Sequence, residues 1–95
     1  MKILSEKFTA GGFLHTQLER DDIFAIYKRS KGSQEHFEVI EIRSHNGYEI
    51  SGVKIEPAEI YPSAEKWGTL GWTHIDYDGA KDRFNKLRSK GKVKK

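Results

Sequence analysis

Residues 71–91 read GWTHIDYDGAKDRFNKLRSKG and combine a strand pattern with a helix pattern. In the first part, Thr73 and Ile75 share one face while Trp72 and His74 point the other way, as in a short strand. In the second part, apolar residues recur three, four and three positions apart and form one narrow stripe: Tyr77, Ala80, Phe84 and Leu87. Asp76 is placed to cap this helix and Gly91 to end it, so the segment predicts a strand followed by an amphipathic C-terminal helix.

The residues before this segment carry strand patterns separated by turn residues. Runs rich in apolar and β-branched side chains occupy residues 13–20, 23–29, 37–43 and 48–55. Asn46-Gly47 lies between the last two runs and favours a type I′ hairpin turn, because both positions tolerate positive φ. We therefore expect an α+β fold: a small antiparallel sheet of four to five strands, a meander around the Asn46-Gly47 hairpin, with the one amphipathic C-terminal helix packed on it.

Two of the expected strands have apolar residues on both faces. The run at 23–29 is apolar in both phases at its beginning, and in the run at 37–43 the apolar phase slips between Val39 and Ile40. Such a slip predicts either a β-bulge or burial on both faces. We expect residues 1–91 to form one domain and residues 92–95 to form a basic, frayed tail.

Residues 61–72, YPSAEKWGTLGW, hold both tryptophans of the chain and one tyrosine. Ser63 and Gly68 are placed to begin and end a single helical turn. Large aromatic side chains recur both in cores and at recognition surfaces. The block therefore either covers the core or forms a partner-binding surface, with three candidate residues: Tyr61, Trp67 and Trp72.

The net charge of +3 conceals a strong asymmetry along the chain. Residues 81–95 hold eight basic residues and one acidic residue, which gives +7. Subtracting this from the total leaves −4 for residues 1–80. A weakly acidic body with a basic end is typical either of a polyanion-binding protein or of a solvated tail that aids solubility.

Catalytic and metal-binding patterns are absent from the sequence. There is no cysteine, and the four histidines show no pair at helical ligand spacing. The sequence also lacks the Gly-x-Ser-x-Gly and P-loop motifs. Six glutamates could supply a carboxylate pair for acid–base catalysis, or could lie on the solvent face of the sheet opposite Arg43, Lys28 or Lys54: Glu35, Glu38, Glu41, Glu49, Glu56 and Glu59.

We predict from these patterns a non-enzymatic protein with no cofactor and no metal. The N-terminal residues turn polar at once, and no apolar run approaches ~18 residues, the length of a membrane span. A soluble, cytoplasmic protein without a membrane partner is therefore expected.

The basic C-terminal helix and tail are the candidate surface for nucleic acid or another polyanion, since neutralising phosphates gives affinity that does not depend on base sequence. The candidate contacts are Lys81, Arg83, Lys86, Arg88, Lys90, Lys92 and Lys94. The alternative is a protein-interaction module, a host-factor modulator or a homodimer, that uses Tyr61, Trp67 and Trp72, because such side chains are enriched at binding hot spots.

Residues 61–87, from the YPSAEKWGTLGWT segment to Ala80, Arg83, Phe84 and Leu87, resemble small uncharacterised proteins of phages and mobile elements. The resemblance covers about a third of the chain and corresponds to no defined family. It implies binding to a host protein or to nucleic acid, and it transfers no catalytic residue.

Overall fold

The computed structural model describes the backbone of residues 2–92 and the side chains of residues 2–90. In chain order the elements are β1 (Lys7–Ala10), β2 (Phe13–Asp21), β3 (Phe24–Lys31), β4 (Gln34–Glu41), β5 (Arg43–His45), β6 (Tyr48–Ile50), β7 (Val53–Ile55), β8 (Ala58–Ile60), the 3-10 turn η1 (Ala64–Lys66), β9 (Gly71–His74) and α1 (Tyr77–Lys92).

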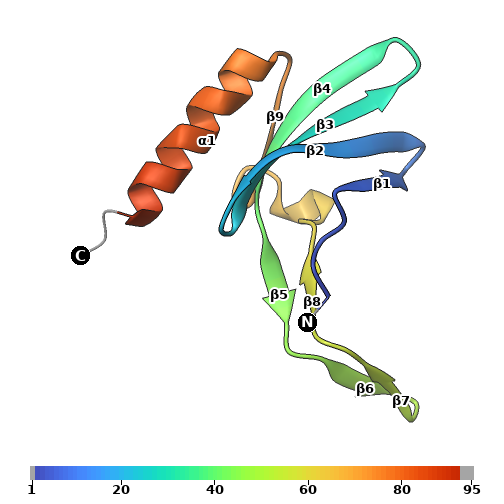
Figure 1. Ribbon diagram of the computed structural model, residues 1–95. Coiled ribbons are helices and arrows are strands. Elements are labelled where there is room, and N and C mark those ends of the chain that lie inside the picture. Colours follow the sequence, from blue (N-terminus) through green and yellow to red (C-terminus); the bar gives the residue numbers. More distant parts are fainter. Residues whose placement is uncertain (1, 93–95) are drawn as a thin grey trace.

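Five strands form one antiparallel sheet in the order β1-β2-β3-β4-β9, and α1 packs against β3, β4 and β9 (Figure 1). This arrangement confirms the predicted α+β fold. The sequence pattern does not predict β1, which pairs with β2 across Gly11-Gly12. Both glycines have positive φ, so they make the tight turn that a two-residue hairpin requires.

Both faces of the central strands are buried. The core beneath α1 contains Ile26, Val39, Ala80 and Phe84, and the core on the opposite face contains Ala25, Tyr27, Ile40 and Ile42. The adjacent residues Val39 and Ile40 therefore belong to different cores, and the β3–β4 register runs through them without a shift. The phase slip in the sequence therefore reflects burial on both faces of the strand. Each fully buried side chain of this size contributes about 1.5–3 kcal/mol to the free energy of folding.

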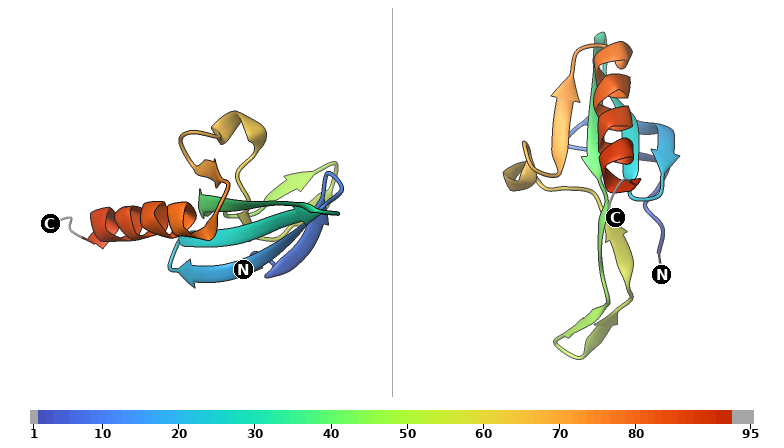
Figure 2. Two further views of the ribbon diagram at one scale, coloured as in Figure 1. Left: turned by 90° about the horizontal axis from the view of Figure 1, so that it is seen from above. Right: turned by 90° about the vertical axis from the view of Figure 1, so that its left-hand side faces the viewer.

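Residues 43–60, from β5 to β8, form an extension that we call the arm. The arm and α1 lie at opposite ends of the molecule (Figure 2, right). Within the arm β5 pairs with β8 and β6 pairs with β7, and the tight turn is made by Ser51 and Gly52, with φ of 50° and 82°. The predicted hairpin at Asn46-Gly47 is therefore wrong, and the strands of the arm do not join the main sheet.

The bend at Gly47 has a steric cause. Gly47 has a φ of 93° and lies where the two sides of the arm approach closely. A Cβ at this position would lie 2.9 Å from the Ile55 carbonyl oxygen. Pro57, which the register places opposite Asn46, has no N–H to donate, and the strand ladder is interrupted at this level. The arm therefore bends at Asn46-Gly47, and the chain reverses its direction at Ser51-Gly52.

The ends of α1 agree with the sequence at one end only. Asp76 Oδ1 accepts a hydrogen bond from the Gly79 N–H at 2.8 Å, which confirms the predicted cap. Gly91 lies inside the helix, which continues to Lys92, so the predicted end at Gly91 is wrong. A glycine inside a helix lowers its stability by only about 1 kcal/mol relative to alanine, so the helix can continue through it. Residues 93–95 of the predicted tail lie outside the described residues.

The connection between β8 and β9 contains the predicted single turn. η1 occupies Ala64–Lys66, between Ser63 and Gly68, and Gly68 has a φ of 95°. The Ser63 side chain, however, makes no capping hydrogen bond.

Across residues 2–92, no helix has the length and apolar character that crossing a lipid bilayer requires.

Candidate nucleic-acid interface

The apolar stripe of α1 divides its polar surface into two flanks. Lys81 and Arg88, seven residues apart, lie beside β2 and define the β2 flank. Arg83, Lys86 and Lys90, at spacings of three and four, lie on the side of β9 and define the β9 flank. The basic residues that the sequence predicts as one broad surface are therefore separated into two groups.

The β2 flank is occupied by ion pairs with the sheet. Lys81 Nζ and the Tyr77 hydroxyl both donate to the Glu19 carboxylate, one to each oxygen. Arg88 Nε donates to Asp21 Oδ2 at 2.6 Å. These pairs are only about one-third exposed, and each joins α1 to β2 across the edge of the core. Lys81 and Arg88 therefore act mainly in holding the helix on the sheet.

The cations of the β9 flank are more accessible. Among the described side chains, Lys86 forms an ion pair only with Asp82 on its own helix, at 3.3 Å, and both are more than two-thirds exposed. Lys90 is exposed and forms no ion pair with the rest of the described chain. A hollow of about 300 Å³ lies along this flank and is lined by His74, Gly79, Asp82, Arg83, Lys86, Leu87 and Lys90.

Arg83 is held in a fixed orientation at the wall of this hollow. Its Nε donates to His74 Nε2 at 3.2 Å, and its guanidinium carbon lies 4.8 Å from the centre of the Trp72 ring. Burial, together with the positive charge of Arg83, lowers the pKa of His74 from its usual 6.5. His74 is therefore neutral at pH 7, and its unprotonated Nε2 can accept the Arg83 hydrogen bond.

The aromatic block does not form one surface. Trp72 is half-buried and lies under Arg83 on the helix side of the sheet, whereas Tyr61 and Trp67 pack on the opposite core. The rings of Tyr61 and Trp67 stack at 6.4 Å, and Trp67 Nε1 donates to Thr73 Oγ1 at 2.9 Å. The structure thus brings Tyr61 and Trp67 together and separates Trp72 from them.

Trp67 also fixes the entry into β9. A Cβ added at Gly71 would lie 2.5 Å from the Trp67 ring, so only glycine fits beneath it. Gly71 is buried in the structure. The tryptophan therefore closes one end of the core, and its indole is half-buried in doing so.

A buried polar cluster lies next to Tyr61, and the sequence pattern does not predict it. Glu38 is 6% exposed and accepts a hydrogen bond from the Tyr61 hydroxyl at 2.5 Å. Arg29 Nε and His15 Nε2 lie 3.7 and 3.8 Å from its two oxygens. Burial, followed by the negative charge of Glu38, raises the pKa of Tyr61 well above its usual 10, so the phenol remains a hydrogen-bond donor.

The glutamates expected on the solvent face have mixed locations. Glu35 pairs with Lys28 at 3.4 Å and Glu41 pairs with Arg43 at 2.8 Å, as predicted. The prediction is wrong for Glu38, which is buried, and for Glu59, whose two oxygens each accept a 2.7 Å hydrogen bond from the guanidinium of Arg20. A glutamate within an alternating strand pattern gives no local sign that loop residues will cover it.

The remaining predicted contacts are Lys92 and Lys94. Lys92 is the last residue of α1, its side chain lies outside the described residues, and so does the whole of Lys94.

Among the described residues no group of three or more His, Cys, Asp or Glu is arranged to hold a metal ion. Comparison with protein-family models, with curated proteins and with solved structures finds no match to this chain.

Proposed function

We propose that the protein is a non-enzymatic binding protein that contacts nucleic acid, or another polyanion, through the β9 flank of α1. The supporting observation is that Arg83, Lys86 and Lys90 line a single hollow, while the other described cations of the helix, Lys81 and Arg88, are paired with carboxylates of β2. The accessible positive charge of the helix is thus concentrated on one side.

The local contacts favour exchange of Asp82 for a phosphate. An exposed ion pair such as Lys86–Asp82 contributes only about 0–1 kcal/mol, so a phosphate can replace the carboxylate at little cost. Arg83 is already oriented by His74, and an oriented guanidinium matches the geometry of a phosphate. Lys90 extends the same row by one helical turn.

Affinity from this surface should be modest and independent of base sequence. Three phosphate contacts give a slope of about −2.7 for log K against log salt on duplex DNA, so binding should weaken about 40-fold between ~50 and ~200 mM salt. Trp72 is covered by Arg83, which leaves no exposed indole beside the flank for base stacking. The proposed recognition is therefore electrostatic.

The test compares two triple variants with the same change in charge. Arg83→Gln, Lys86→Gln and Lys90→Gln together remove the β9 flank, and Lys2→Gln, Lys54→Gln and Lys66→Gln remove three exposed cations elsewhere. Binding of labelled single- and double-stranded oligonucleotides is followed by fluorescence anisotropy at several salt concentrations. We expect the flank variant to lose at least about 10-fold in affinity and the control to change less than about threefold.

Two results would count against the proposal. If the unmodified protein shows no binding to either oligonucleotide at low salt, nucleic acid is not the ligand. If both triple variants lose the same affinity, net charge alone accounts for the binding and the β9 flank is not an interface.

The protein-interaction module that uses Tyr61, Trp67 and Trp72 remains the alternative. These side chains are half-buried and packed on the sheet or under Arg83, so partner binding through them would use only their exposed edges. Trp67→Ala tests the idea: loss of a partner in a pull-down with retained stability supports it, whereas a loss of about 3–5 kcal/mol in unfolding free energy indicates a core role.

A further inference from the structure

The distal half of the arm has one apolar face and one charged face. Its β6–β7 register pairs Tyr48 with Ile55 and Ile50 with Val53, and it pairs Glu49 with Lys54. Because side chains alternate along a strand, the four apolar residues share one face and the two charged residues lie on the other. The arm is therefore an amphipathic hairpin.

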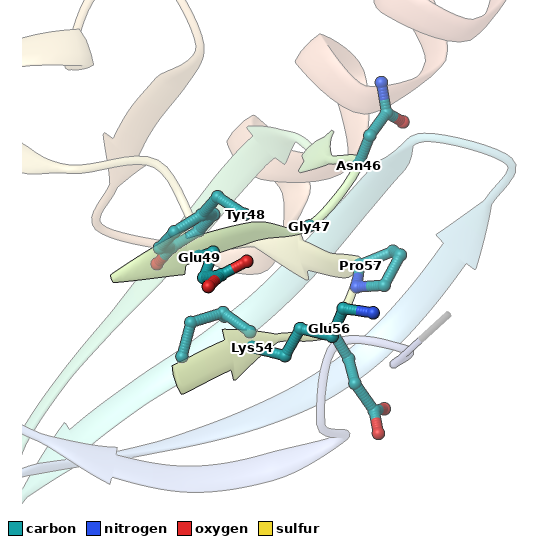
Figure 3. Close-up of a pocket in the computed structure, with 8 residues that line it drawn as sticks. Asn46, Gly47, Tyr48, Glu49, Lys54, Glu56 and Pro57 are labelled. Atoms are coloured by element: carbon teal, nitrogen blue, oxygen red, sulfur yellow. The ribbon is translucent and has the colours of Figure 1, made fainter. Parts of the chain in front are cut away.

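The apolar face is mostly exposed. Tyr48 is 50% exposed, Ile50 56% and Val53 60%, whereas Ile55 is half-buried. A hollow of about 420 Å³ lies beside Tyr48 (Figure 3). The residues that line it come from β6, from β7 and from the two segments that join these strands to the base of the arm, Asn46-Gly47 and Glu56-Pro57. A two-stranded hairpin is only marginally stable by itself in water, and exposed apolar patches on folded chains mark interaction sites.

Two further exposed apolar residues lie near the base of the arm. Ile60 on β8 is 43% exposed, and Ile3, next to the bridge between Lys2 and Ala58, is 63% exposed. The ring of His45 contacts that of Tyr48 and links the two halves of the arm. The register places Ile60 opposite Arg43, out of phase with Tyr48 and Ile50, so the apolar face of the arm is that of β6 and β7.

We propose that the apolar face of the arm is a homodimer interface, which packs face to face on the same face of a second copy of this chain. The inference stands apart from the proposed polyanion binding, because the β9 flank lies on the helix at the opposite end of the molecule (Figure 2, right).

The area fits a second copy. Tyr48, Ile50 and Val53 are each half exposed or a little more, which amounts to roughly 300 Å² of apolar surface on each copy. A stable interface buries about 800 Å² on each partner, and about 65% of a homodimer interface is apolar, which is roughly 500 Å². Each arm therefore supplies more than half of the apolar area of a standard interface, which corresponds to a weak dimer that forms at high protein concentration.

The charges on the arm also favour a second copy and determine how it packs. Arg43 and Lys54 balance Glu49 and Glu56, and the fifth charged residue of the arm, Glu59, is paired with Arg20. Two arms therefore approach without strong repulsion, and a strongly charged partner gains nothing there. Edge-to-edge pairing of two arms would place Glu49 near Glu49, or Lys54 near Lys54, and like charges across strands are destabilising. Packing through the apolar faces avoids both contacts.

The first test is the oligomeric state by sedimentation velocity and light scattering, from about 1 µM to about 1 mM protein. We expect twice the monomer mass of 11.0 kDa at the upper end of the range. Ile50→Glu should raise the dimer dissociation constant at least about 10-fold, whereas Ile75→Glu, at a residue 83% exposed on the helix side, should change it less than about twofold. A monomer at every concentration, or equal effects of the two variants, would overturn the proposal.

The second test identifies the face that is in contact. The chain has no cysteine, so single cysteines at neighbouring positions of β7 report on opposite faces. Under mild oxidation, Val53→Cys should form a disulfide-linked dimer much faster than Lys54→Cys, because a disulfide needs Cα atoms within about 7 Å. Equal rates for the two variants would show that the arms do not meet through the apolar face. Far-UV circular dichroism of Ile50→Glu at low concentration confirms that the monomer is folded.

Discussion

The two flanks of α1 carry the same kinds of basic residue in different surroundings. On the β2 flank, Lys81 and Arg88 contact carboxylates more than 60 residues away in the sequence. On the β9 flank, Lys86 pairs within the helix and Lys90 is exposed. A basic residue can therefore serve either folding or binding, and its neighbour across the fold decides which. The predictions below separate these two roles.

The largest effect should come from the stripe that lies between the flanks. Phe84 is 1% exposed and packs on Ile26 and Val39, so Phe84→Ala should lower the unfolding free energy by about 3–5 kcal/mol and weaken both flanks together. Urea denaturation followed by fluorescence measures the change. Ile75→Ala, at an exposed position, is the control and should stay within about 0.5 kcal/mol. A loss below about 1 kcal/mol for Phe84→Ala would mean that α1 does not depend on this core.

The pair Arg20–Glu59 gives the reference for a well-formed ion pair. Hydrogen bonds from Arg20 lower the pKa of Glu59 from 4.5 to about 2, so the pair contributes stability above pH 4.5 and loses it as the pH falls toward 2. Glu59→Gln should cost about 2–3 kcal/mol at pH 7. The loss should shrink in acid, as measured by denaturation at several pH values. A cost that does not change between pH 7 and pH 3 would contradict this assignment.

The two flanks should differ in their contribution to stability. Lys81→Met and Arg88→Met each remove one partner of a partly buried carboxylate and should cost about 0.5–1.5 kcal/mol. Lys90→Met removes an exposed charge and should stay within about 0.5 kcal/mol. Thermal unfolding of the three variants measures the difference. Equal costs on both flanks would remove the distinction.

The smallest effect concerns His74. Because the folded state lowers its pKa, the unfolded chain binds a proton first as the pH falls below 6.5, and stability declines in that range; above 6.5 both states are neutral and there is no contribution. His74→Gln keeps an acceptor for Arg83 and should flatten the dependence of stability on pH between about 7 and 5. Identical slopes for the two proteins would contradict the lowered pKa.

The sequence predicts those parts of the fold that depend on local periodicity. The stripe of α1 follows from spacing and is confirmed. The phase slip at Val39–Ile40 predicts a bulge or burial on both faces, and the structure shows the burial. The arm could not be predicted in this way. The Asn46-Gly47 signal is overridden by the β5–β8 and β6–β7 pairings on its two sides and by the turn at Ser51-Gly52, which are properties of the folded ribbon.

The charge pattern is predictable in amount and not in availability. The sequence shows how many cations α1 carries, but Glu19 and Asp21, which occupy Lys81 and Arg88, lie on a strand far away in the sequence. The buried Glu38 was missed for the same reason, since Tyr61 reaches it from the loop before β9. Tertiary contacts, and not residue types, decide these roles.

The most direct test of the account compares the two flanks in one binding experiment. Lys86→Gln with Lys90→Gln, and Lys81→Gln with Arg88→Gln, each remove two positive charges from the same helix. Anisotropy titrations of a labelled single-stranded oligonucleotide, at low salt and at a temperature where both variants are folded, measure the affinity. We predict a loss of about 10-fold or more for the β9-flank pair and of less than about threefold for the β2-flank pair. Equal losses, or a larger loss for the β2-flank pair, would contradict the account.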